Sequence, residues 1–296
     1  MVPEVRSPTV RRRELGALLR ALRTEKGLTV EQVAESLLCS SSKVSRMETG
    51  QRGATPRDIR DLCDLYGVTD EIERDRMMQL AREGKQAGWW QSYDLDSFAT
   101  YVGLEAEAVE ILYYQSTIVP GLLQTPEYAR AIHTAAVPKI PPPRIEELIE
   151  VKLKRQRILS RTQPVRLRVV FDEATLHRVV GGMRVMGAQL NRLAELTTLP
   201  NVTVQVIPFR TGAHPAMDST FNLLYFAGPP HHMVYVEGLM GWFYLQSPQE
   251  TDKYQQVFER LRTISLSPKE SIELIMKIGA RYRAASGVTV PASTER

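Results

Sequence analysis

The side chains best suited to chemistry in this chain are small hydroxyl and basic groups crowded into one short segment. They should lie on the outer face of a helix, because Val44 and Met47 have the spacing of an inner face. Serine hydroxyls let a helix approach DNA bases closely, and lysine and arginine bond to guanine or phosphate. The segment therefore predicts a surface that contacts DNA. Its polar members are Ser41, Ser42, Lys43, Ser45 and Arg46.

Two short helices joined by a tight turn must position this surface. Thr29 and Gln32 have the spacing of a capping box that begins the first helix, and Gly50 is a stop signal for the second. This arrangement is typical of a helix-turn-helix, whose second helix enters the major groove. We expect Thr29 and Gln32 to add DNA contacts, and Arg52 in the following loop to bind phosphate.

Further helices should complete a small helical domain around this pair. Leucines three and four residues apart predict a helix over about 10–25 that ends at Gly27. Thr55 and Pro56 are the N-cap and first residue of another, and a last helix should span about 69–85. The sequence thus predicts an all-α, five-helix DNA-binding domain over residues 1–85.

The charge of the chain is unevenly distributed. The first 60 residues hold 12 Lys and Arg against 7 Asp and Glu, whereas the remainder holds 26 against 27. The positive excess therefore coincides with the predicted DNA-binding segment, where phosphate contacts need it. A solvated basic terminus is the alternative, which Arg11, Arg12 and Arg13 alone would also fit.

Length and composition exclude several classes of protein. A chain of 296 residues is long enough for two domains, and its 43% hydrophobic and 24% charged residues are ordinary for a globular protein. No apolar run could span a membrane, and the N-terminus lacks the apolar stretch of a signal peptide. Cys39 and Cys63 are expected to be small buried side chains rather than a disulfide. We expect a cytoplasmic protein.

The pattern changes after a junction at residues 86–97, where Trp89 and Trp90 should pack against the next domain. Residues 98–285 mix strands and helices, which predicts an α+β domain around one sheet and so a multidomain protein. Residues 286–296 form a polar tail that we expect to be disordered. The expected strands lie at about 108–115, 165–171, 202–207, 219–226 and 233–237, and the expected helices at about 98–102, 125–136, 144–160, 184–197, 248–264 and 268–285.

Two loops of this second domain are candidates for a ligand pocket or partner surface. Residues 120–128 and 209–218 combine glycine, proline, histidine and apolar residues without regular periodicity. Loops of this kind often carry recognition on a rigid scaffold, although ordinary structural loops are the alternative. The candidate residues are Pro120, Gly121, Leu122, Gln124, Tyr128, His214 and Met217.

Other candidates for chemistry have plainer explanations. His214, His231 and His232 match no compact metal motif. Paired glycines before the helix at 184–197 could hold phosphate but fit an ordinary turn. Asp172 with Glu173 could form an acid–base pair with a carboxylate on another strand, or simply begin a helix. We expect no metal, no cofactor and no catalytic site, hence no enzyme.

Residues 12–68 resemble the lambda-repressor-like helix-turn-helix of the xenobiotic-response-element (XRE) family. The resemblance lies in the Ser-Lys-Val-Ser-Arg-Met-Glu-Thr-Gly run and in the ending at residues 64–68. It implies operator binding, usually as a dimer, with base contacts by residues 41–43 and Arg46. Many members have glutamine where this chain has Val30, and glycine where it has Leu38. The second difference predicts a turn that is not the tightest variant.

Residues 88–285 resemble the C-terminal domain of actinobacterial WhiJ-like, Scr-type antitoxin-like regulators. The landmarks include Gly88-Trp89-Trp90, the 119–125 segment, Asp172-Glu173-Ala174, the 201–208 strand region and Gly212-Ala213-His214-Pro215. The resemblance implies repressors of development or secondary metabolism. Such regulators are often paired with a small BldB-like partner protein that acts through this domain.

We interpret the chain as a sequence-specific transcriptional regulator, a repressor that binds double-stranded operator DNA as a homodimer. Its C-terminal domain would be gated by a small partner protein or a ligand. Two alternatives stay open at this point. An antitoxin-like protein would sequester a small cognate protein and bind DNA only for autoregulation, and an enzyme fused to a DNA-binding domain would carry a bound nucleotide.

Overall fold

The computed structural model describes residues 8–85, 88–95, 98–227, 232–238 and 241–286. The chain divides into two compact units. Unit 1 comprises residues 1–108 and 226–232, and unit 2 comprises residues 109–225 and 233–296. The expected tail at 286–296 lies outside the described residues beyond Ser286, as do parts of the 86–97 junction. Among the described residues, no helix is long and apolar enough to cross a membrane.

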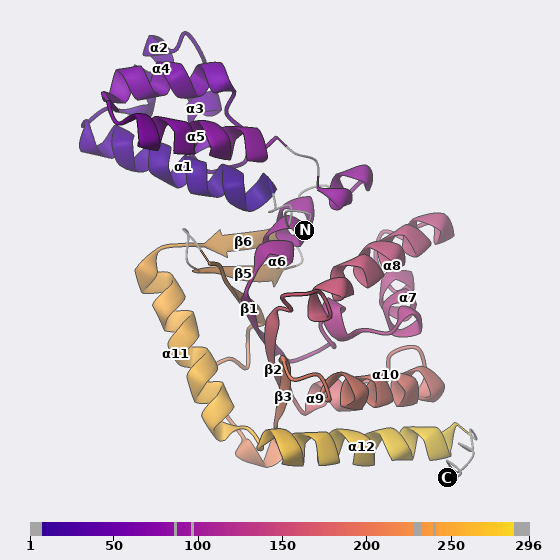
Figure 1. Cartoon of the computed structure of the whole chain (residues 1–296). Helices are drawn as coiled ribbons and strands as arrows, with labels where there is room; N and C mark the ends of the chain where they lie inside the picture. Colours follow the sequence, from indigo (N-terminus) through magenta and orange to yellow (C-terminus); the bar gives the residue numbers. More distant parts are fainter. Residues whose placement is uncertain (1–7, 86–87, 96–97, 228–231, 239–240, 287–296) are drawn as a thin grey trace. The chain divides into compact units, whose positions relative to one another are not determined.

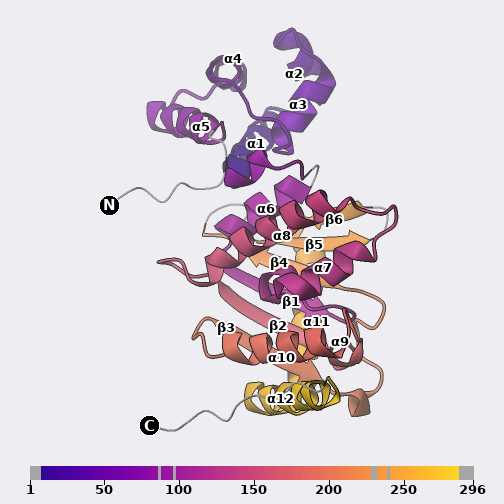
Figure 2. The same cartoon turned by 90° about the vertical axis from the view of Figure 1, so that its right-hand side faces the viewer.

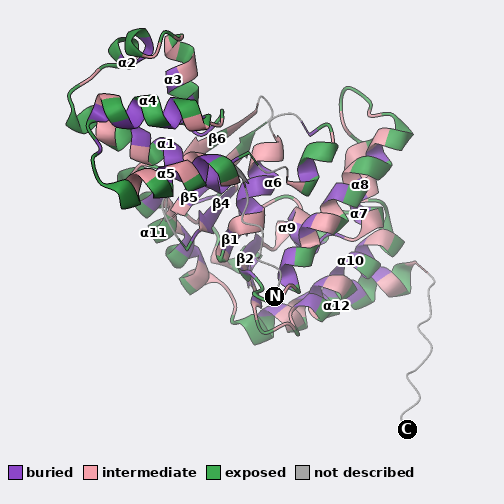
Figure 3. Ribbon diagram, turned by 45° about the horizontal axis from the view of Figure 1, so that its top comes forward, coloured by how far each residue is buried: buried purple, intermediate pink, exposed green. Residues whose placement is uncertain are grey.

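Unit 1 is helical and its first five helices surround one apolar core (Figure 1). Leu19, Val33, Ile59 and Met77 are almost fully buried there. Figure 3 shows buried and exposed residues alternating along α4, as expected of a helix with one face in a core. The five expected helices are present. The helices are α1 (Pro8–Glu25), α2 (Val30–Ser36), α3 (Ser41–Glu48), α4 (Pro56–Tyr66), α5 (Glu71–Glu83) and α6 (Phe98–Glu107), with a 3₁₀ turn η1 (Trp89–Ser92).

Local capping chemistry sets the helix boundaries of unit 1. The Thr29 side chain accepts a bond from Gln32 N, while Gln32 Oε1 accepts one from Thr29 N at 2.8 Å. Thr55 caps α4 with Pro56 in the first turn, and Gly67 ends that helix with φ +68°. These boundaries confirm the predictions made from the capping motifs, because each depends on residues only a few positions apart.

The turn between α2 and α3 is tighter than expected from the leucine at position 38. Leu38 has φ +49° and is the only non-glycine residue of positive φ in the described part of the chain. Its N–H donates to Glu35 O at 3.1 Å, and Cys39 N donates to Ala34 O at 2.9 Å. These bonds close the helix end in the left-handed geometry that glycine favours. The turn is therefore as tight as the glycine variant, with a leucine held in a strained conformation.

The region after α5 packs against the same unit. Trp90 is buried, and Gly103 of α6 lies so close that a Cβ there would be 2.9 Å from the Trp90 ring. A Cβ on Gly103 would also approach Thr9 of α1. These contacts group α6 with unit 1, whereas the sequence predicts a domain boundary at residue 98.

Unit 2 is built on a six-stranded sheet in the order β3-β2-β1-β4-β5-β6 (Figures 1 and 2). β1 and β3 both run parallel to β2, and β4 is antiparallel to β1. β5 and β6 form an antiparallel pair at one edge. The strands are β1 (Glu110–Gln115), β2 (Arg166–Asp172), β3 (Val202–Ile207), β4 (Phe221–Tyr225), β5 (His232–Gly238) and β6 (Gly241–Leu245).

Helices cover both faces of this sheet. α11 packs on one face, where Phe258 and Leu261 meet Tyr114, Val170 and Phe221 in one apolar cluster. α7, α8 and α10 lie on the opposite side of the sheet (Figures 1 and 2). The helices are α7 (Pro126–Thr134), α8 (Pro142–Gln156), α9 (Ala174–His177), α10 (Met183–Leu196), α11 (Pro248–Ile264) and α12 (Pro268–Ala285), with 3₁₀ turns η2 (Gly121–Leu123), η3 (Arg157–Leu159) and η4 (Phe209–Thr211).

The predicted α+β class is confirmed, and most expected elements of unit 2 are present. The last two helices have the predicted bounds, and the expected helix at 144–160 divides into α8 and η3. β6 is an element that the sequence interpretation missed. It lies at the sheet edge with no clear alternation of buried and exposed residues, so its sequence lacks the usual signal of a half-buried strand.

Candidate functional site

The outer face of α3 presents the polar residues expected to contact DNA. Ser42, Ser45 and Arg46 are exposed, and Ser41 is partly exposed. Val44 and Met47 are almost fully buried, as predicted from their spacing. Ser40 caps the helix by accepting a bond from Lys43 N at 3.2 Å. The result is a short helix with an exposed polar face.

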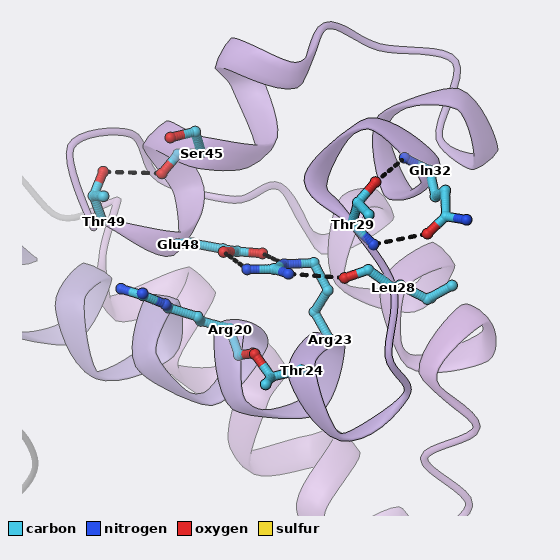
Figure 4. A network of polar contacts seen from close by, with 9 residues as sticks. All are labelled: Arg20, Arg23, Thr24, Leu28, Thr29, Gln32, Ser45, Glu48 and Thr49. Atoms are coloured by element: carbon cyan, nitrogen blue, oxygen red, sulfur yellow. Dashed lines mark hydrogen bonds and ion pairs between the residues drawn. The ribbon is translucent and has the colours of Figure 1, made fainter.

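An ion pair holds α3 against α1 (Figure 4). Arg23 of α1 donates to both carboxylate oxygens of Glu48 at 2.6 and 3.0 Å, and to Leu28 O at 2.8 Å. The hydrogen bond to Glu48 raises the pKa of Arg23. A Cβ on Gly16 would lie 2.5 Å from Glu48 O, so the two helices cross at backbone contact. The position of α3 within unit 1 is thus fixed by packing and by a bidentate pair.

The side chain of Lys43, expected to be free to contact bases, is bound to another residue of unit 1. Its Nζ donates to Asp58 Oδ1 at 2.6 Å, and Asp58 Oδ2 accepts from Thr55 N and Thr55 Oγ1, each at 2.8 Å. Burial favours a higher pKa for Asp58, but the bonds from Lys43 and Thr55 outweigh it and lower the pKa. The lysine therefore ties α3 to α4 in this structure, which helical spacing within α3 could not reveal.

The remaining expected DNA contacts are on the surface. Arg46 Nε donates to Ser42 O at 3.2 Å, and the guanidinium lies along its own helix. Arg52 is exposed in the next loop. Thr29 and Gln32 are exposed at the N-terminus of α2, where their capping bonds hold them (Figure 4). A helix N-terminus attracts phosphate through its free N–H groups.

Much of the 120–128 segment, expected to form a ligand pocket or a partner surface, lies inside unit 2. Leu122, Gln124 and Tyr128 are buried. Tyr128 Oη accepts from Val119 N at 3.2 Å, and Gln124 Nε2 donates to Val119 O at 2.5 Å. Their polar atoms are thus used inside the unit, so these three side chains offer little surface to a protein partner.

Two glutamines from distant helices hold the same segment. Gln156 of α8 donates to Gly121 O and Gln124 O at 3.1 and 2.8 Å. Gln189 of α10, fully buried, donates to Leu123 O and accepts from Thr125 N, both at 2.7 Å. A loop without periodic structure can be buried only if its backbone is satisfied in this way. The segment can therefore lie in the core because Gln156 and Gln189, distant in the sequence, satisfy its backbone.

The second candidate loop divides between core and surface. The His214 side chain is only 2% exposed, and its Nε2 lies 3.3 Å from Asp172 Oδ2. Asp172 Oδ1 also accepts from Ala174 N, so this carboxylate anchors the loop to the end of β2. Met217 is 63% exposed and remains available to a partner.

The proposed acid–base carboxylates are also engaged in structural bonds. Glu173 accepts from Phe209 N at 2.7 Å and lies 3.3 Å from His177 Nε2. Glu237 is exposed on β5. Among the described residues, no group of three or more His, Cys, Asp and Glu could hold a metal ion, and His231 lies outside them. Cys39 and Cys63 are free thiols.

Lys152 is a residue that the sequence interpretation missed. It lies on α8, and burial lowers its pKa to about 7, with Arg155 adding to the effect. Its Nζ donates to Gln124 Oε1 at 2.6 Å and lies 3.4 Å from His133 Nε2. The available signal was its position seven residues after Ile145 and three after Ile149, on the apolar stripe of the helix.

The fold of unit 1, with an exposed polar helix held behind a tight turn, defines a helix-turn-helix DNA-binding regulator. Residues 14–77 match a family model described as a helix-turn-helix domain. Residues 98–277, more than half of the chain, match the model described as Domain of unknown function (DUF5753). The chain belongs to the DUF5753 family. No curated protein and no solved structure matched the chain.

Proposed function

We propose that this regulator recognises a specific operator by inserting α3 into the DNA major groove. The observation that carries the proposal is the exposed face of Ser42, Ser45 and Arg46 on a helix whose other side is fixed in the core. Small hydroxyls permit close approach, and the guanidinium of Arg46 can bond two acceptors of one guanine. Arg52 and the N-terminus of α2 supply phosphate contacts beside it.

The regulator acts as a homodimeric repressor of the XRE type. A single helix-turn-helix contacts one short half-site, so two copies related by a two-fold axis double the contacts and require a palindromic operator. The positive excess within residues 1–60 supports binding to two phosphate backbones. Repression follows where such an operator overlaps a promoter.

The DUF5753 domain receives the signal that gates DNA binding, in the manner of WhiJ-like regulators. A small BldB-like protein or a ligand is the proposed effector. Because most of the 120–128 segment is buried, we assign the contact with a protein partner to the exposed part of the 209–218 loop. There Phe209 is 58% and Met217 is 63% exposed, and exposed apolar side chains of this size favour a protein contact.

Binding of the full-length protein to its own promoter DNA across a salt series tests the proposal. We expect a specific complex that weakens with salt and changes on adding a small protein encoded nearby. Specific binding that ignores this protein would point to a small-molecule effector. A tight protein–protein complex without any specific DNA binding would favour the antitoxin-like alternative and overturn the proposal.

A further inference from the structure

Lys152 lies in unusual surroundings for a lysine. Among the residues that the structure describes, the two atoms within hydrogen-bonding distance of its Nζ are both uncharged, the amide oxygen of Gln124 at 2.6 Å and Nε2 of His133 at 3.4 Å. Lysine ammonium groups that leave water are normally paired with a carboxylate. The buried charge here has hydrogen bonds but no bonded counter-ion.

The charges around Lys152 do not supply the missing partner. Arg155, one turn further along α8, is a second buried cation whose field opposes the ammonium. Glu237 of β5 is the acidic group that favours it, and Glu237 is exposed to solvent. His133 of α7 has a pKa of about 4, lowered by burial and by Lys152, so its ring is neutral near pH 7. The two groups in contact with Lys152 Nζ therefore carry no negative charge.

The hydrogen-bonding groups of this cluster are fixed before any ligand arrives. Gln124 Nε2 is bound to Val119 O at 2.5 Å, which turns Gln124 Oε1 toward Lys152. Gln156 holds the backbone of the same residue at 2.8 Å. Lys152 and His133 nevertheless retain partial exposure to solvent. A third proton of the ammonium is left for an additional acceptor.

We propose that Lys152, with His133 and Gln124 beside it, binds the oxyanion group of a small molecule, a carboxylate or a phosphate. The anion accepts the remaining proton of Nζ and supplies the counter-charge that neither residue bonded to Lys152 provides. This site lies between α7, α8 and the 120–128 segment, within the domain to which we assign signal reception. Anion binding itself does not depend on that assignment, because it is measured without DNA.

Calorimetric titration of the full-length protein tests the site, with sodium sulfate as a phosphate surrogate and sodium acetate as a carboxylate. Sodium chloride at the same ionic strength is the reference. Loss of one charge-assisted hydrogen bond weakens binding by about ten- to a hundredfold. We therefore expect Lys152→Met to bind the anion about ten- to a hundredfold more weakly than the wild type. The control is Lys154→Met on the same helix, where Lys154 already pairs with Glu150 at 2.9 Å. It should leave binding unchanged.

The pH dependence gives a second readout. Binding needs the charged ammonium of Lys152. The pKa of Lys152 without a bound anion is about 7, so this ammonium is protonated in only a small fraction of molecules at high pH. Between about pH 6 and pH 8.5 the apparent affinity should fall roughly thirtyfold, because sulfate and acetate keep their charge over this range. His133, neutral throughout, does not contribute to the change.

Labelling of the wild-type protein avoids dependence on a variant that fails to fold. Reductive methylation followed by mass spectrometry should show Lys152 protected by the bound anion and Lys154 unprotected. Protection of Lys152 by sulfate but not by acetate would identify a phosphate site. Protection by acetate but not by sulfate would identify a carboxylate site. Equal protection of both lysines, or equal protection by chloride, would overturn the proposal.

Discussion

Arg46 is the residue of α3 that we propose distinguishes between bases. Among the described residues no carboxylate pairs with it, and its bond to Ser42 O is easily exchanged for a guanine edge. Arg46→Ala should therefore weaken operator binding by about 1–3 kcal/mol and relax specificity at one base pair. Fluorescence anisotropy on operator variants measures both effects. Arg82→Ala on α5, where the arginine is also exposed, is the control, and equal losses in the two variants would refute the assignment.

Lys43 should behave as a positioning residue, because its ammonium is bound to Asp58. Lys43→Met should reduce stability by about 1 kcal/mol at neutral pH and reduce DNA affinity less than Arg46→Ala does. The pKa of Asp58 is lowered in the folded state, so the contribution of this pair is present above about pH 4 and disappears as the pH falls through that pKa.

Chemical unfolding at pH 7 and in acid, followed by circular dichroism, measures the contribution of Lys43. A double-mutant cycle with Asp58→Asn isolates the pair. Zero coupling energy at pH 7, or a larger loss of DNA affinity than in Arg46→Ala, would restore Lys43 to direct base contact.

Among the structural elements, the turn between α2 and α3 carries strain in Leu38. A non-glycine residue in the left-handed region costs about 1–2 kcal/mol, and Leu38 is 94% exposed, so its side chain buries little in return. Leu38→Gly should raise stability by about 1 kcal/mol, after the flexibility of glycine in the unfolded chain offsets part of the gain. Thermal unfolding measures the change. A lower melting temperature would show that the leucine side chain makes a stabilising contact.

The crossing of α1 and α3 depends on Gly16. A Cβ there would lie 2.5 Å from Glu48 O and 2.6 Å from Met47 O, both backbone atoms that cannot move aside cheaply. Gly16→Ala should therefore displace α3 and destabilise unit 1 by about 1–3 kcal/mol, despite the better helix propensity of alanine. Gly53→Ala, whose Cβ would meet nothing closer than 3.5 Å, is the matched control. Unfolding by urea compares them, and similar midpoints would contradict the close crossing.

For the chain as a whole, the uneven charge makes DNA affinity depend on salt. Each phosphate contact releases about one counter-ion, so Arg52→Ala should flatten the plot of log affinity against log salt by about 0.9 and weaken all sequences alike. Titrations at several sodium chloride concentrations, on operator and on unrelated DNA, test this. A loss confined to the operator would instead assign Arg52 to base contact.

Much of unit 1 could be predicted because its signals are local. The capping pairs Thr29–Gln32 and Thr55–Asp58 lie three residues apart, and the inner face of α3 follows from Val44 and Met47. The helix bounds and the exposed polar face of α3 therefore follow from a few neighbouring residues. The same is true of α11 and α12, whose serine caps precede proline.

The contacts that decide the sites connect residues far apart in the sequence. Lys43 and Asp58 are 15 residues apart, Lys152 and Gln124 are 28 apart, and Thr125 and Gln189 are 64 apart. No spacing rule reaches so far, so the burial of the 120–128 segment and the contacts of Lys152 became visible only in the folded structure. Local propensity and periodicity were enough to establish which helices form and which side of α3 is polar. Which polar groups remain free depended on the fold, because burial and pairing are set by distant neighbours.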